Sequence, residues 1–365
     1  MLADKHLTMT RIPHCSHAKK HEKTHPPLFS SRDFDDAFTW LCASRKYFPA
    51  DADIWHLRFH WTRERENLLS SVNRGEWCFS PLTVTRPRHG ERRALWSSTD
   101  ALIIKCIAQK LTDILPTHPR CEHVAGHGGG KDSIGRVHSI LKTRQYGYVC
   151  RTDIKGYYAN IDKIKLFNQI QQYIRSPELL GLIWQFLHYS VEFGGNFHTP
   201  TKGIARGAAL SPLLAAFHLY SIDDYFGRQS GVYYARYMDD FIIFTRTRWH
   251  LRRAVQKLNV FLSEYGFQQH PDKTFIGSIA KGFDWMGSWF TDKGRQSVAP
   301  RALSNLRDKL HRLYEQMRNK PEVEKTLRMV TYLKRWLTWA RFDAFEITNK
   351  PTGSIILNGE CRCSV

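Results

Sequence analysis

Residues 232–247 read VYYARYMDDFIIFTRT, and this stretch decides the fold. Its two halves are rich in aromatic and β-branched residues, a composition typical of strands. We therefore expect a buried hairpin whose tight turn carries Asp239 and Asp240. A charged pair between apolar strands costs free energy unless a cation neutralises it. A solvated turn is the plainer interpretation of an Asp-Asp pair, but these flanks are too apolar for a surface loop.

A third carboxylate, Asp153, lies where another hydrophobic strand gives way to Lys155 and Gly156. A divalent metal would neutralise such a cluster, and Mg²⁺ prefers carboxylate oxygens while leaving positions for water and phosphate. If Asp153 joins the pair in space, the three carboxylates can hold two ions about 3.5–4 Å apart. That geometry suits in-line displacement at phosphorus, with Mg²⁺ as the expected cofactor and Mn²⁺ as a substitute.

The charge of the chain points to a polyanionic partner. The 365 residues include 54 Lys and Arg but only 34 Asp and Glu, so the net charge is +20. We expect nucleic acid before an anionic membrane, with a merely soluble basic protein as the alternative. No apolar run approaches the roughly 18 residues of a membrane span, and the first residues lack the apolar stretch of a signal peptide. The eight scattered cysteines form no disulfide framework, so we expect a cytoplasmic protein.

The pattern along the chain predicts mixed helix and strand between two tails. Residues 1–30 read as a disordered basic tail, although its histidines and Cys15 offer metal ligands as an alternative. The glycine-rich segment 126–136 reads as a flexible connector. In the first part of the chain we expect helices over 31–75 with a break at 49–51, a hairpin over 79–98 with its turn at 89–90, and a helix over 99–115. The middle part is expected to form a short strand from 148, helices to about 190, and a loop and helix over 201–226. After the hairpin at 232–247 we expect a helix over 249–266, strands over 274–290, and basic helices over 301–342.

Six stretches resemble, in the family's order, the motifs of bacterial reverse transcriptases of the group II intron and retron-like type. They are ERRALWSSTDALI (91–103, a fingers segment), RTDIKGYYANI (151–161, motif A), KGIARGAALSPLLAA (202–216, motif B), YMDD (237–240, motif C), HPDKT (270–274, motif D) and FDWMGSWF (283–290, motif E). One such motif would be a weak signal, whereas six in order identify the chain as similar to this family.

The resemblance implies an α+β right-hand polymerase with fingers, a palm built on an antiparallel sheet, and a helical thumb. The implied bounds are 31–150 for N-terminal helices and fingers, 151–295 for the palm with a helical insertion at about 165–200, 297–345 for the thumb, and 346–365 for a C-terminal tail. The implied activity is RNA-directed DNA synthesis, from a dedicated noncoding RNA template, with RNA, DNA and dNTPs as partners. A stand-alone retroelement or antiviral-defence enzyme is expected, as a homo- or hetero-oligomer. The alternatives are a maturase-like RNA-binding protein and an RNA-dependent RNA polymerase.

The resemblance also assigns roles to single residues. Asp153, Asp239, Asp240 and the carbonyl of Ile154 are the implied metal ligands. Tyr158 is the implied steric gate against the 2′-hydroxyl, with a core tyrosine beside Tyr157 as the alternative. Lys273 is the implied general acid for pyrophosphate, with a surface lysine as the alternative. The implied nucleotide-binding residues are Arg93, Lys155, Tyr157, Tyr158, Arg206 and Gly207. The implied nucleic-acid-binding residues are Arg86, Arg88, Arg92, Lys131, Met238, Trp285, Arg307, Arg312, Lys334 and Arg335.

Two positions depart from the pattern of the family. Arg206 stands where most relatives have glutamine, which adds a cation near the nascent base pair. Ala101 follows Asp100 where relatives often have arginine, and Arg92 or Lys105 is a candidate to compensate. The aromatic residues near the end of the last helix are expected in the core rather than as a stacking platform; they are Trp336, Trp339 and Phe342.

Overall fold

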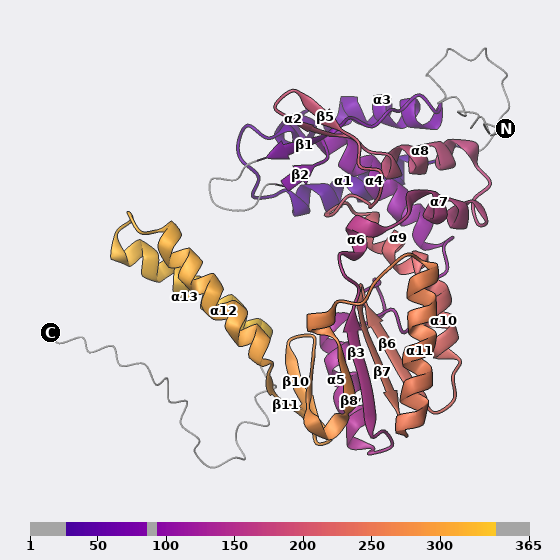
Figure 1. Ribbon diagram of the computed structural model, residues 1–365. Coiled ribbons are helices and arrows are strands. Elements are labelled where there is room, and N and C mark those ends of the chain that lie inside the picture. Colours follow the sequence, from indigo (N-terminus) through magenta and orange to yellow (C-terminus); the bar gives the residue numbers. More distant parts are fainter. Residues whose placement is uncertain (1–26, 86–92, 341–365) are drawn as a thin grey trace, which may run out of the picture.

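The computed structural model describes residues 27–85 and 93–340, without the side chains of Thr85 and Arg93. Figure 1 shows two lobes joined near the middle of the chain and an arm of two helices that projects from the second lobe. Residues 1–26 of the expected N-terminal tail, the whole expected C-terminal tail and the tip of the first hairpin lie outside the described residues. The same holds for Arg86, Arg88, Arg92 and Phe342.

The first lobe combines helices with a small sheet. Its helices are α1 (Ser31–Ser44), α2 (Asp53–Phe59), α3 (Trp61–Asn73), α4 (Ser98–Thr112), α7 (Lys163–Gln171) and α8 (Pro177–Leu187). Its strands are β1 (Leu82–Thr85), β2 (Arg93–Leu95), β4 (Val191–Phe193) and β5 (Asn196–His198), in the order β2-β1-β4-β5. The helices expected over 31–75, their break, the first hairpin and the helix over 99–115 are confirmed.

Two expectations for this lobe are wrong in part. The tail expected to reach residue 30 ends earlier, because Phe29 is buried and its backbone exchanges two hydrogen bonds with the Asn73 side chain. The insertion at about 165–200 is not only helical, because it ends in the β4–β5 hairpin. Gly194 and Gly195 take positive φ at its turn, and β4 pairs in parallel with β1. Strands of three residues are too short to show a clear alternation in sequence.

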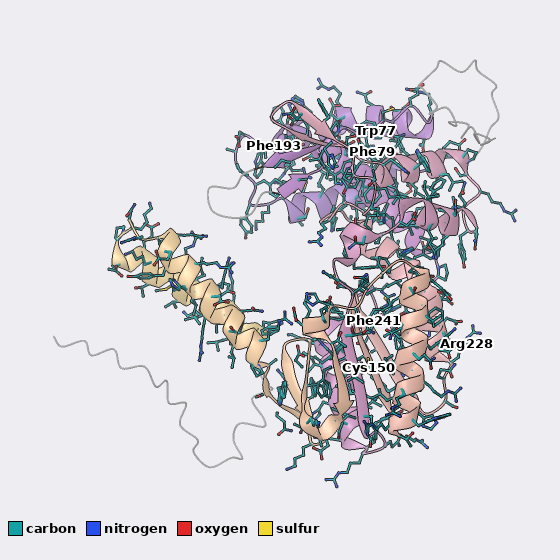
Figure 2. All side chains as sticks on the ribbon, in the orientation of Figure 1. Trp77, Phe79, Cys150, Phe193, Arg228 and Phe241 are labelled. Carbon is teal, nitrogen blue, oxygen red and sulfur yellow. The ribbon has the colours of Figure 1, made fainter. Side chains whose placement is uncertain are left out.

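The second lobe is built on an antiparallel sheet with the order β6-β7-β3-β8. Its strands are β3 (Tyr148–Asp153), β6 (Val232–Tyr237), β7 (Asp240–Thr245) and β8 (Phe275–Ser278). Helices α10 (Tyr220–Gly227) and α11 (Arg248–Glu264) cover one face, toward which Cys150 and Phe241 contribute to the core. Figure 2 labels both residues within this lobe. The short helix α6 (Tyr157–Asn160) and α9 (Ser211–His218) lie between the two lobes (Figure 1).

The opposite face of this sheet packs against α5 (Gly129–Lys142) and a three-stranded sheet. The strands of that second sheet are β9 (Phe283–Trp285), β10 (Ser288–Thr291) and β11 (Gly294–Val298). The expectation of a flexible connector at 126–136 is therefore wrong, since the larger part of this segment belongs to α5. Val137 and Leu141, one helical turn apart, are buried against the sheet, and this packing outweighs the glycines. Because α5 packs in the second lobe, that lobe begins before residue 151, where the boundary of the palm was expected.

The arm consists of α12 (Pro300–Gln316) and α13 (Glu322–Ala340), coloured orange to yellow in Figure 1. The expectation of basic helices at this end is confirmed. The expected core position of the aromatic residues is wrong for Trp339, which is 49% exposed and packs against Trp336. Among the described residues, no helix is long and apolar enough to cross a membrane.

Candidate active site

Three carboxylates meet at one end of the central sheet. Asp153 is the last residue of β3 and Asp240 the first of β7, and the strand register sets the two directly opposite each other. Asp239 lies in the turn that joins β6 to β7. One oxygen of each carboxylate lies within 4.8 Å of the other two. The hairpin predicted from the sequence therefore forms, and the tertiary fold adds Asp153 to its turn.

The surroundings of these carboxylates disfavour their negative charges. Burial raises the pKa of Asp240 to about 6, although the Arg151 guanidinium opposes this shift. Burial, and next the charge of Asp153, raises the pKa of Asp239. Like charges that face each other across two strands are destabilising. Asp240 Oδ1 is buried and makes no hydrogen bond among the described residues, and Arg151 Nη2 at 3.2 Å is a cation paired with it. Three clustered carboxylates are hard oxygen donors, which fit a divalent cation such as Mg²⁺.

Lys273 lies at the edge of this cluster. Its Nζ donates a hydrogen bond to Asp153 Oδ2 at 2.6 Å. The residue ends the short 3₁₀ turn η1 (Pro271–Lys273), and His270 before it donates its N–H to the Asp153 carbonyl at 2.7 Å. This backbone contact fixes the position of the turn, so the ammonium group stays beside the carboxylates. The sequence suggested Lys273 by motif, and the structure places its ammonium group against Asp153.

A second cation, Arg151, was missed by the sequence analysis. It lies two residues before Asp153 on β3, so both side chains lie on the same face of the sheet. Its Nη2 is 3.2 Å from Asp240 Oδ1 and 3.2 Å from Asp284 Oδ2 on β9. Its Nη1 donates to the Lys273 carbonyl at 2.5 Å. The period-two spacing of Arg151 and Asp153 was the available signal. Arg151 connects the carboxylate cluster to β9 and the turn that carries Lys273.

The turn between β6 and β7 is held in an uncommon backbone conformation. Met238 has a φ of +55°, in the left-handed region that side chains other than glycine rarely adopt. The Met238 N–H donates to Nδ1 of His123 at 3.0 Å. Burial lowers the pKa of His123 to about 4, so the ring is neutral and its Nε2 can donate to the Pro212 carbonyl at 3.1 Å. His123 therefore positions the turn that carries Asp239.

The carbonyl of the same residue is held by a buried arginine. Arg236 Nη1 donates to the Met238 carbonyl at 2.8 Å, and Nη2 donates to the Ala216 carbonyl at 2.9 Å. Neither Arg236 nor Asp223 is exposed to solvent, and they form a two-pronged ion pair at 2.5 and 2.7 Å. Burial alone would lower the pKa of Arg236, but Asp223 holds it above its ordinary value. This pair was also missed, because the partners are separated by a helix end and a loop.

The two tyrosines of α6 have different environments. Tyr158 is half-buried, and burial, then the charge of Asp239, raises its pKa to about 12. Its carbonyl accepts the Ile204 N–H at 2.9 Å, which joins α6 to the loop before α9. Tyr157 is fully buried, and its hydroxyl donates to the Ala215 carbonyl at 2.7 Å. The expectation that Tyr157 binds nucleotide is therefore wrong, since its ring packs edge-on against Tyr158 inside the core.

The remaining nucleotide-binding candidates lie near this site. Arg206 and Gly207 are exposed in the loop before α9, and Gly207 has a φ of +80°. They help to line a cavity of about 190 Å³ between this loop, α1, β2 and α4. Lys155 is exposed, and its N–H donates to the Gln268 carbonyl at 2.9 Å. Ile154 is buried and donates its N–H to the Asp239 carbonyl at 3.1 Å, which fixes β3 against the turn.

The nucleic-acid-binding candidates divide by exposure. The expectation that Trp285 binds nucleic acid is wrong, because its side chain is fully buried and its Nε1 donates to the Ser133 hydroxyl at 2.8 Å. Met238 is half-buried in the turn. The exposed candidates are Lys131 on α5, Arg307 and Arg312 on α12, and Lys334 and Arg335 on α13. The Arg93 side chain lies outside the described residues.

Asp100, the residue before the departure at Ala101, has a structural role. Asp100 before it is buried and accepts hydrogen bonds from Trp77 Nε1 at 3.2 Å and the Ser97 hydroxyl at 2.7 Å. Asp100 therefore stabilises the start of α4. Lys105, a candidate to compensate for the missing arginine, lies 5.3 Å from the centre of the Trp40 ring and so points toward α1.

The three carboxylates at the end of paired strands could together hold a metal ion, and comparison with known proteins identifies the family. The family model described as reverse transcriptase (RNA-dependent DNA polymerase) matches residues 93–290, more than half of the chain. The chain therefore belongs to the reverse transcriptase family, and its α+β architecture is the right-hand polymerase fold.

Curated relatives agree with this assignment. The group II intron-encoded protein LtrA of Lactococcus lactis subsp. cremoris is 33% identical over 93 residues. The same protein from strain MG1363 of that organism matches equally. The match covers 24% of this chain and 16% of the relative, so it spans a small part of that protein.

Proposed function

We propose that this protein is an RNA-directed DNA polymerase that makes cDNA by metal-assisted nucleotidyl transfer. The observation that carries the proposal is the cluster of Asp153, Asp239 and Asp240, whose oxygens lie within 4.8 Å of one another. The cluster lies inside the stretch that matches the reverse transcriptase family. When bound, two Mg²⁺ ions would activate the 3′-hydroxyl and stabilise the pyrophosphate leaving group.

The surrounding side chains support the same chemistry. The Lys273 Nζ lies 2.6 Å from Asp153 Oδ2, beside the carboxylates, so its ammonium group can protonate the leaving pyrophosphate. Tyr158 beside Asp239 can exclude a 2′-hydroxyl and thus select dNTPs. The exposed cations Arg206 and Lys155 can bind the triphosphate, Arg206 as a bidentate donor.

The lobes take the roles of the right-hand polymerase in this proposal. The first lobe serves as the fingers and the second as the palm, which begins with α5 rather than at residue 151. The arm serves as the thumb, and its exposed cations can bind the phosphates of an RNA–DNA hybrid. A dedicated noncoding RNA as template, and a role in a retroelement or in antiviral defence, belong to the same proposal.

The test is the double substitution Asp239→Asn with Asp240→Asn. We expect Mg²⁺-dependent dTTP incorporation on poly(rA)/oligo(dT) to fall to background, while RNA affinity and Tm change little, because the carboxylates serve the metal rather than the core. The matched control is Asp51→Asn with Asp292→Asn, which removes two exposed carboxylates elsewhere. Equal incorporation by the double variant and the wild type would refute the proposed site.

The wild-type protein also decides between the alternative activities. Incorporation of dTTP on the RNA template supports the proposal. Tight RNA binding without incorporation of any nucleotide would instead identify a maturase-like binder, and preferential incorporation of UTP would identify an RNA polymerase.

A further inference from the structure

The central sheet has a second end, opposite the carboxylates. Asp153 ends β3, whereas Tyr148 begins it and pairs with Thr245 of β7 and Ser278 of β8. Five steps of about 3.3 Å separate Tyr148 from Asp153, which places this distal end roughly 16 Å from the aspartates along the strands. Hydrogen bonds from Gly147 to the Thr245 carbonyl at 3.1 Å, and from Ile279 to the Gly147 carbonyl at 3.0 Å, hold the three adjoining segments together.

These segments carry cations and no acidic residue. Residues 142–147, 245–253 and 278–282 contain seven Lys and Arg and no Asp or Glu. We call the seven the distal basic surface. Its members are Lys142, Arg144, Arg246, Arg248, Arg252, Arg253 and Lys281. The sheet is four strands wide, so the strand ends around which these residues gather span only about 14 Å.

The members of the distal basic surface are exposed and unneutralised. All seven side chains are exposed, and none lies within 4.0 Å of a carboxylate in the part of the chain that the structure describes. By contrast, Arg228 at the C-terminal end of the neighbouring α10, labelled in Figure 2, is paired with Asp224 at 2.8 Å. Clustered like charges repel one another unless a polyanion neutralises them.

Two further features favour nucleic acid as that polyanion. Trp249, which follows Arg248 in the chain, is 58% exposed, and the Arg253 guanidinium lies 4.6 Å from the centre of its ring. An exposed ring among cations offers a base a stacking partner beside phosphate contacts. No other large apolar side chain of the three segments is exposed among the described residues, so an apolar face for insertion into a membrane is missing.

Arg144 is kept at a position where glycine would be favoured. It follows the end of α5 and has a φ of +54°, in the left-handed region where a side chain is strained. Its N–H donates to the Leu141 carbonyl at 3.1 Å, the usual contact of such a helix end. The chain therefore places an exposed guanidinium here at the expense of backbone strain, which indicates a role for the side chain rather than the backbone.

We propose that the distal basic surface binds the sugar–phosphate backbone of a folded RNA, at a site separate from the catalytic end of the sheet. A duplex RNA presents rows of phosphates that match exposed arginines without requiring a base sequence. Such a contact would hold a structured RNA partner at the distal end of the central sheet while a single strand enters the active site. The binding does not depend on polymerase activity, because none of these residues approaches the aspartates.

The experiment compares two triple variants of the full chain. Arg246→Gln, Arg248→Gln and Arg252→Gln remove three charges from the distal basic surface. The control, Arg32→Gln, Arg63→Gln and Arg175→Gln, removes three exposed charges from the first lobe. The probe is a fluorescein-labelled 30-base-pair RNA hairpin, and anisotropy gives Kd between 50 and 200 mM KCl.

We expect the distal variant to raise Kd about 10-fold or more at 150 mM KCl, and the control less than about 2-fold. The slope of log K against log salt should fall by about 2–3, at about 0.9 per lost phosphate contact. Primer extension on a short template–primer should be unchanged. Equal losses in both triple variants, or unchanged hairpin binding in the distal one, would overturn the proposal.

Arg144→Gly separates binding from folding. Glycine removes the charge and relieves the positive φ, so we expect weaker hairpin binding with a Tm that holds or rises. Vesicles of phosphatidylglycerol and phosphatidylcholine form a second arm. If the distal variant loses vesicle binding but keeps hairpin binding, the surface binds membranes and the proposal is refuted. The Asp239 and Asp240 double variant should bind the hairpin normally, so failure of the catalytic proposal is distinguishable from failure here.

Discussion

Arg236→Met tests how the turn that carries Asp239 is held in place. The substitution removes the partner of a fully buried carboxylate, Asp223, and the donors to the Met238 and Ala216 carbonyls. Breaking one side of a buried ion pair costs about 3–5 kcal/mol, because the remaining charge is left uncompensated. At about 1–2 °C per kcal/mol for a chain of 365 residues, Tm should fall by about 3–10 °C.

The double variant separates the stability of the fold from the position of the turn. Arg236→Met with Asp223→Asn leaves no buried charge, and the amide oxygen can still accept the Tyr234 hydroxyl that Asp223 accepts at 2.6 Å. We therefore expect most of the lost Tm to return. Polymerase activity should stay low, because the Met238 carbonyl still lacks its donor. A displacement of about 1 Å at a reacting centre can cost about 10²-fold in rate.

Both quantities are measured in the same preparations. Tm is followed by tryptophan fluorescence, and kcat by dTTP incorporation on poly(rA)/oligo(dT). The matched control is the exposed pair on α10, Arg228→Met with Asp224→Asn, which should cost at most about 1 kcal/mol and leave kcat unchanged. Two results would refute the reasoning: a Tm loss in Arg236→Met no larger than in the exposed control, or full recovery of kcat in the buried double variant.

Three further substitutions test neighbouring parts of the site. Tyr158→Ala should admit ribonucleotides, measured as the ratio of UTP to dTTP incorporation, whereas Tyr157→Phe should leave that ratio unchanged and cost about 1 kcal/mol of stability for one lost hydrogen bond. Trp285→Phe should lower stability in urea unfolding by about 1 kcal/mol without changing RNA affinity; weaker RNA binding at unchanged stability would contradict its buried position. Arg151→Met should lower Tm at pH 8 more than at pH 5, because Asp240, with a pKa of about 6, is mostly charged only at the higher pH and then lacks its cation. An equal loss of Tm at both pH values would show that Arg151 does not stabilise the fold through Asp240.

Local patterns in the sequence indicated the strands of the central sheet, most of the longer helices and the turn with its two carboxylates. The apolar flanks of Asp239 and Asp240 favour a hairpin, because runs of aromatic and β-branched residues suit paired strands that are buried on both faces. The order of six motifs then indicated the family and joined Asp153 to the pair. Patterns of this kind are short-range, so they remain readable in the chain itself.

The tertiary structure alone decided which side chains face the site and which face the core. Tyr157 and Tyr158 are neighbours in sequence, yet one is buried against α9 and the other lies beside Asp239. Trp285 looked available for nucleic acid, but α5 covers it. Burial depends on elements packed from distant parts of the chain, which no local pattern records.

The same holds for the groups that position the carboxylates. Arg151 reaches Asp240 only because β3 and β7 are paired in one register, and His123 reaches Met238 across 115 residues. The distal basic surface likewise exists only because three strand ends meet. The sequence by itself therefore indicated the three carboxylates and the family. Which cations, histidines and surfaces serve that chemistry was decided by packing, since contacts between segments far apart in the chain arise only when the sheet and its helices assemble.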